Sequence, residues 1–286
     1  MKLRGVNKLV PAIATSDGAG VKLNRTIGGP VLDSLDPFLL LDEFGSEDGA
    51  DYIGGFPDHP HRGFETVTYM LDGLMRHEDN TGAAGTLGPG GVQWMTAGRG
   101  IVHSEMPQQE DGLMRGFQLW VNLPAAEKMC VPRYQNLAPE EIPEVDGDGG
   151  VRIRVIAGEA GGVSGAVNGI AVEPIYLDIL LPAKTEHVQP VPDSHTALCY
   201  VFEGEVAIVN SADGFADGSV VDVPHHTLAV LGDGEAVHMR AGAEGGRTLL
   251  VAGKPLGEPV VRYGPFVMNT REEIEQAIHD YQAGRF

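Results

Sequence analysis

Alternation between polar and apolar residues predicts several short β-strands in this chain. In the segment 64–71 the even-numbered residues fall on one face of an extended chain and the odd-numbered residues on the other. Asp72 and Gly73 follow as a hairpin turn. Similar patterns, each bounded by turn residues, predict further strands over residues 92–96, 117–122, 151–157, 175–181, 198–202, 205–209 and 248–252.

The last part of the sequence follows a different period. Thr270 and Glu273 have the spacing of a capping box, in which each side chain satisfies a backbone amide near the other residue. Apolar residues then recur at positions 274, 277, 278 and 281, and Gly284 comes just after them. The pattern predicts one amphipathic helix over residues 271–283, packed across a sheet.

Composition supports a mostly β protein. The 286 residues include 40 Gly and 19 Pro, which suits many short strands joined by tight turns better than a helical bundle. Hydrophobic residues make up 42% of the chain, enough for a packed core. The two cysteines, Cys130 and Cys199, exclude a disulfide framework and favour a cytoplasmic location.

The net charge of −20, from 20 Lys and Arg against 40 Asp and Glu, narrows the range of partners. Phosphate backbones and anionic membranes are bound through clustered basic residues, and the sequence contains no basic run. No apolar stretch approaches the roughly 18 residues that a membrane span needs. We therefore expect neither direct nucleic-acid binding nor membrane association.

Length and a faint repeat indicate two domains. At about 150 residues per domain, the chain has room for two. Residues 69–73 (YMLDG) resemble residues 200–204 (YVFEG) at an offset of 131, as expected for two similar β domains in tandem. The polar, acidic segment 139–150 predicts a linker between a first domain at 1–138 and a second at 151–286.

Two histidine-containing pairs supply the candidate chemistry. His59 and His61 point to the same side of an extended segment, and His103 and Glu105 repeat this spacing further along the chain. Three imidazoles and a carboxylate suit Fe, Mn, Ni, Cu or Zn better than Mg or Ca. A single His-x-His pair is more often a surface feature or a hydrogen-bonded pair, whereas two such pairs in turn-rich β sequence favour a metal site.

The same residues carry a family resemblance. His-x-His-x₃-Glu, followed by Pro-Gly and a later His, resembles the two motifs of the cupin superfamily. The wider strings DPFLLLDEF at 36–44, GFPDHPHRGFETVTY at 55–69 and GRGIVHSEM at 98–106 resemble the pirin family. Pirins are bicupins of about this length, so the resemblance implies an all-β fold of two tandem cupin barrels (double-stranded β-helix, or jelly-roll) with a C-terminal helix.

The resemblance also implies a mononuclear iron site in the first barrel. Its ligands carry over to His59, His61, His103 and Glu105, with Fe(II) as the expected cofactor and Mn, Ni, Cu or Zn as alternatives. Many cupins use a carboxylate at the position of Glu65. Pirins use the later glutamate, so we expect an outer role for Glu65, such as an ion pair with Arg62.

The second barrel is expected to lack a metal. The repeat places Pro190 and Pro192 opposite His59 and His61, and proline cannot ligate a metal. Of the six histidines in this half of the chain, four remain as candidate ligands, and the adjacent pair at 225–226 would point to opposite faces of a strand. We expect these four to be dispensable for metal binding and oxygen consumption: His187, His195, His225 and His226.

Two functions follow from the resemblance. One is a quercetin 2,3-dioxygenase, which opens a flavonol ring with O₂ and releases carbon monoxide, with Glu105 as both ligand and general base. The alternative is a non-catalytic redox-sensing protein that binds a transcription factor or a metabolic enzyme, and a structural bicupin with an adventitious metal is a third reading. The chain is expected to be a monomer.

Overall fold

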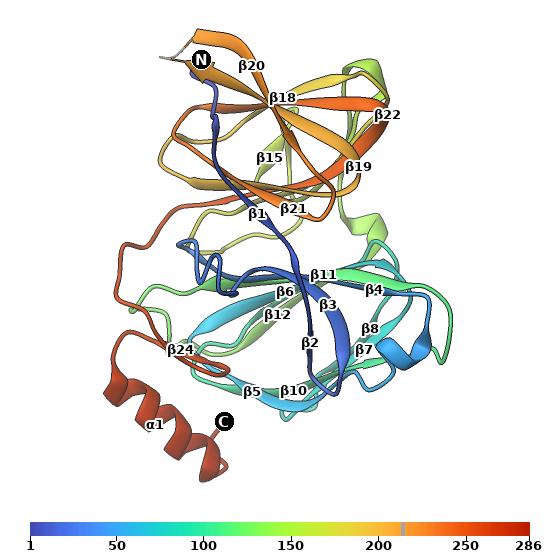
Figure 1. Ribbon diagram of the computed structural model, residues 1–286. Helices are drawn as coiled ribbons and strands as arrows, with labels where there is room; N and C mark the ends of the chain where they lie inside the picture. Colours follow the sequence, from blue (N-terminus) through green and yellow to red (C-terminus); the bar gives the residue numbers. More distant parts are fainter. Residues whose placement is uncertain (213–214) are drawn as a thin grey trace. The chain divides into compact units, whose positions relative to one another are not determined.

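The computed structural model describes residues 1–212 and 215–286, and it consists mainly of strands with one α-helix (Figure 1). These residues form two compact units. We call residues 13–140 and 256–286 the N-barrel, and residues 1–12 and 141–255 the C-barrel. In the part of the chain that the structure describes, no helix is long and apolar enough to cross a membrane.

The N-barrel contains two main sheets. The seven-stranded sheet has the order β12-β9-β6-β11-β4-β3-β2 and the four-stranded sheet the order β5-β10-β7-β8. The strands are β2 (Ile13–Asp17), β3 (Val21–Ile27), β4 (Phe38–Ser46), β5 (Phe56–His61), β6 (Phe64–Asp72), β7 (Met75–Asp79), β8 (Ala84–Leu87), β9 (Val92–Thr96), β10 (Ile101–Pro107), β11 (Met114–Asn122) and β12 (Arg133–Leu137).

The C-barrel is built on one sheet of nine strands. The main path runs β1-β21-β19-β22-β17-β14-β13, with β18 paired to β22 and β20 paired to β19. The strands are β1 (Val6–Pro11), β13 (Glu144–Asp146), β14 (Arg152–Ala157), β17 (Ile175–Leu181), β18 (Glu186–Pro190), β19 (Thr196–Ala212), β20 (Phe215–Val223), β21 (Thr227–Leu231) and β22 (Ala236–Gly253). A small hairpin is formed by β15 (Glu159–Ala160) and β16 (Val163–Ser164).

The predicted all-β fold and its closing helix are confirmed. Strands β9 and β17 have the predicted bounds, whereas the predicted strands 198–202 and 205–209 are parts of the single long strand β19. Helix α1 (Arg271–Gln282) begins with the predicted capping box between Thr270 and Glu273. It packs against the hairpin of β23 (Val261–Tyr263) and β24 (Phe266–Met268).

The structure divides the chain differently from the predicted domains at 1–138 and 151–286. Strand β1 pairs with β21 and so joins the C-barrel, while residues 256–286, including α1, join the N-barrel. The predicted linker 139–150 contains β13, which pairs with β14. Pairing between segments more than 200 residues apart leaves no local trace in the sequence, so the exchange of chain ends could not be read from composition.

Candidate metal centre

Two adjacent strands of the N-barrel bring three histidines together. His59 and His61 lie on β5 and His103 lies on β10, and the antiparallel register places His103 opposite His59. One ring nitrogen from each of the three lies within 4.8 Å of the others. The predicted convergence of these imidazoles is therefore present in the structure, and it follows from the two-residue period of each strand.

Burial leaves ring nitrogens in this group without protein partners. His61 and His103 are buried, and His59 is half-buried. Among the described residues, His61 Nδ1 and both ring nitrogens of His103 have no hydrogen-bond partner. Buried polar atoms are nearly always hydrogen-bonded, so unpartnered nitrogens at this position fit a site that holds a cation.

His59 carries its proton on a defined nitrogen. Its Nδ1 donates a hydrogen bond to the Pro57 carbonyl oxygen at 2.8 Å, because a carbonyl can only accept. The lone pair then lies on Nε2. Metal-ligating histidines commonly donate the N–H of one ring nitrogen to a carbonyl and bind the metal through the other. His59 is thus held in the tautomer that a metal ligand needs.

The local electrostatics keep the two buried imidazoles neutral. Burial, followed by the neighbouring His59, lowers the pKa of His103 to about 3. Burial also lowers the pKa of His61 well below its ordinary value, with His103 and His59 adding to the effect. A neutral imidazole is the form that binds a metal, so these side chains stay available at neutral pH.

Glu105 lies on the same strand as His103 and is fully buried. Its Oε1 accepts a hydrogen bond from Thr68 Oγ1 at 2.8 Å, and its Oε2 accepts one from Gln118 Nε2 at 3.0 Å. Glu105 lines the same cavity as His59 and His61, although it is not part of the close three-histidine group. Thr68 and Gln118, which the sequence analysis did not identify, therefore orient this carboxylate.

The cavity around these groups has a volume of about 310 Å³. Pockets for small molecules usually start at about 300 Å³ and are mostly apolar with a few placed polar groups. Here Asp42, Gln118 and Arg262 supply polar groups beside the histidines, and the apolar part of the wall comes from Leu23, Leu40, Phe44, Phe56, Trp120 and Pro265. The size and lining suit a small organic ligand next to the histidine group.

The expected ion pair between Arg62 and Glu65 is wrong. Arg62 pairs instead with Asp280 of α1, with Nη1 2.8 Å from Oδ2, and its guanidinium lies 4.3 Å from the centre of the Phe286 ring. Glu65 accepts a hydrogen bond from Thr96 Oγ1 at 2.6 Å, and burial raises its pKa. Along β6, residues 65 and 68 have opposite parity, so Glu65 faces away from the side on which Thr68 meets Glu105.

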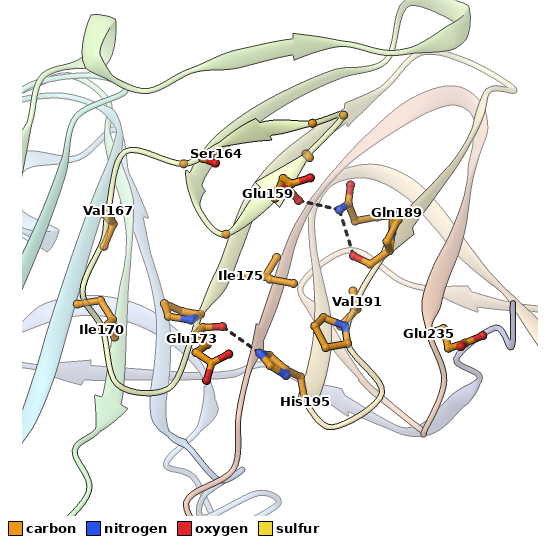
Figure 2. A pocket seen from close by; sticks show the side chains of 18 of the residues that line it. Glu159, Ser164, Val167, Ile170, Glu173, Ile175, Gln189, Val191, His195 and Glu235 are labelled. Atoms are coloured by element: carbon orange, nitrogen blue, oxygen red, sulfur yellow. Dashed lines mark hydrogen bonds between the residues drawn. The ribbon is translucent and has the colours of Figure 1, made fainter. Parts of the chain in front are cut away.

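The histidines of the C-barrel have protein partners. His187 and His195 line a second cavity of about 1110 Å³, and Figure 2 shows the His195 side chain directed at the Glu173 backbone. His195 Nε2 donates to the Glu173 carbonyl oxygen at 2.9 Å, and His225 Nε2 donates to the Phe202 carbonyl oxygen at 2.9 Å. These nitrogens contribute to local structure, and the group of three histidines described above lies in the N-barrel.

Comparison with known proteins identifies the family. The Pirin family model matches residues 20–121, and the model of the Pirin C-terminal cupin domain matches residues 176–286. A pirin-like protein of Caulobacter vibrioides is 51% identical over 287 residues, with 100% of both chains covered. The chain belongs to the pirin family. Pirin from Mus musculus is 50% identical over 269 residues, which cover 93% of this chain and 88% of the mouse protein.

A solved structure extends the match to three dimensions. The crystal structure of a quercetin 2,3-dioxygenase from Acinetobacter baumannii superposes with a TM-score of 0.88 at 34% sequence identity, and the match covers 99% of this chain and 98% of that one. The pirin fold of two cupin barrels thus describes the whole chain. A site with three histidines lies in its first barrel, and the chemistry of that donor set fits a divalent transition metal.

Proposed function

We propose that this pirin-family protein is an iron-dependent dioxygenase of the quercetin 2,3-dioxygenase type. The ligands are His59, His61, His103 and Glu105, and the metal is Fe(II). The observation that carries the proposal is the group of three imidazoles within 4.8 Å, two of them buried, with ring nitrogens that have no partner among the described residues. The resemblance to a quercetin 2,3-dioxygenase structure supports the choice of reaction.

Each part of the site has a chemical role in this proposal. Iron bound by these ligands would supply Lewis acidity and one-electron chemistry toward O₂. The Glu105 carboxylate accepts the proton of the flavonol 3-hydroxyl group as the substrate enters, while Thr68 and Gln118 hold the carboxylate in place. The aromatic side chains of Phe56 and Trp120 line the cavity and limit access of water to the flavonol rings.

The test is oxygen consumption by anaerobically iron-reconstituted protein on addition of quercetin, with carbon monoxide release measured in parallel. Parallel samples loaded with Mn, Ni, Cu or Zn compare the alternative metals. A dioxygenase consumes one O₂ and releases one carbon monoxide for each flavonol opened. Stoichiometric iron binding without oxygen uptake would contradict the proposal and favour the alternative, a redox-sensing protein that regulates a transcription factor or metabolic enzyme by binding it.

A further inference from the structure

Arg262 is an exposed residue that lines the cavity beside the histidines. It comes from β23, in the C-terminal segment that belongs to the N-barrel. Its guanidinium carbon is 4.8 Å from the centre of the Trp120 ring, and that ring is 5.3 Å from the centre of the His61 ring. The Trp120 ring thus contacts both the positively charged guanidinium of Arg262 and the ring of His61, a candidate metal ligand.

The hydrogen-bonding capacity of Arg262 is only partly used. Its Nε donates to the Gly264 carbonyl oxygen at 3.4 Å and its Nη1 to the Leu39 carbonyl oxygen at 3.3 Å, both long for hydrogen bonds. Among the described residues, no carboxylate lies within 4.0 Å of the guanidinium. A guanidinium with donors to spare is suited to bind a planar anion.

Two of the three acidic residues that line this cavity, Asp17 and Asp42, are already paired with a different arginine. Both carboxylate oxygens of Asp42 accept hydrogen bonds from Arg25, at 2.8 and 2.7 Å. Asp17 accepts from Arg25 at 2.8 Å and from the Gly18 amide at 2.8 Å. Their oxygens are therefore occupied, while Arg262 is the only Lys or Arg among the described residues that line the cavity.

We propose that Arg262 determines specificity by recognising an anionic substituent, a carboxylate or phenolate, on the edge of the substrate that points away from the metal. This inference rests on the proposed function, since it assumes that a flavonol-like ring system binds at the three histidines. Trp120, which also lines the cavity, makes a cation–π contact with the same guanidinium. Arg262 is thus a specificity-determining residue and takes no part in oxygen chemistry.

The experiment compares two ligands that differ only in the anion. Binding of 3-hydroxyflavone and of 4′-carboxy-3-hydroxyflavone to the iron-loaded protein is measured anaerobically by quenching of tryptophan fluorescence, so that no turnover is needed. A charge-assisted hydrogen bond predicts roughly tenfold tighter binding of the carboxylate. Arg262→Gln removes this preference, so that the ratio of the two Kd values falls to about one, whereas Arg262→Lys retains part of it.

Arg76→Gln is the matched control, because Arg76 is an exposed arginine of the same barrel, paired with Glu78 and outside the cavity lining. Iron content and thermal melting are measured for every variant. Equal affinity of the unmodified protein for the two flavones, or a preserved preference in Arg262→Gln, overturns the proposal. Failure of the proposed function would give a different result. The protein would then take up no oxygen with quercetin, but its Arg262-dependent preference for the carboxylate would remain.

Discussion

The two barrels of this protein share strand arrangements but differ in what they bury. In the N-barrel, the paired strands β5 and β10 direct His61, His103 and Glu105 into the interior. In the C-barrel, strand β22, which pairs with β18, contributes Val237 and Met239 to a continuous apolar core. The comparison shows that a few inward-facing positions decide whether a cupin barrel gathers a histidine group or a packed apolar core.

The largest effect is expected from removing two of the converging imidazoles. The double variant His59→Ala with His103→Ala leaves one histidine of the group, too few donors for a stable site. Metal content should fall from about one ion per chain to nearly none, and any oxygen uptake with it. Elemental analysis of the purified variant checks this. Full loading would show that metal binding does not depend on His59 and His103.

The next comparison separates two buried glutamates. Glu105→Gln removes a proposed ligand and base together, so oxygen consumption should be lost. Glu65→Gln changes a side chain that bonds Thr96 on the other face of β6, and it should lower activity by at most about 10–100-fold. Turnover of both variants with quercetin provides the measurement. If only Glu65→Gln abolishes turnover, the carboxylate has been assigned incorrectly.

A buried lysine gives the N-barrel a pH-dependent stability. Lys128 donates to the carbonyl oxygens of Gly63 and Val267 and to Asn122 Oδ1, and burial lowers its pKa to about 8 from 10.5. The unfolded chain binds this proton more tightly, so the free energy of unfolding should rise between pH 8 and 10.5. The full rise is roughly 3 kcal/mol, and below pH 8 the cost of the buried charge is fully present.

Lys128→Met provides the reference for this measurement. Urea unfolding of both proteins at a series of pH values gives two stability curves, and their difference isolates the contribution of Lys128 from that of titrating tyrosines. The variant should lack the rise between pH 8 and 10.5. Parallel curves across this interval would show that Lys128 has an ordinary pKa.

The smallest effect is expected in the C-barrel. Replacement of His187, His195, His225 and His226 together by Gln should leave metal content and oxygen uptake unchanged, because none belongs to the close histidine group. Stability should fall slightly, since His195 and His225 each donate a hydrogen bond to a backbone carbonyl oxygen. Loss of half the bound metal with unchanged circular dichroism would reveal a second site in this barrel.

Local patterns predicted the strands and the histidine group well, because both depend on the two-residue period of an extended chain. The same parity, applied to Glu65 and Thr68, places Glu65 on the face of β6 opposite the one on which Thr68 meets Glu105. The partner of Arg62 was beyond such reasoning. Asp280 lies 218 residues away in sequence, so only the fold brings the two side chains together.

Arg262 is likewise far along the chain from His59 and His61, whose cavity it lines. No local pattern distinguishes this arginine from the other basic residues of the sequence. Thr68 and Gln118 are similar cases. They lie on β6 and β11 of the seven-stranded sheet, whereas Glu105 lies on β10 of the four-stranded sheet, so only the folded barrel brings them into hydrogen-bond contact. Residues that complete a site from distant segments require the structure.

The order in which the segments of the two units follow one another along the chain has a consequence for biosynthesis. Residues 13–140 of the N-barrel are translated before residues 141–255 of the C-barrel, yet the hairpin β23–β24 and helix α1 of the N-barrel are translated only after them. The ribosome therefore exposes an unfinished first barrel while the second is being made, and Arg62 meets Asp280 only at the end. Nascent chains arrested before residue 256 should accordingly be the species most dependent on chaperones.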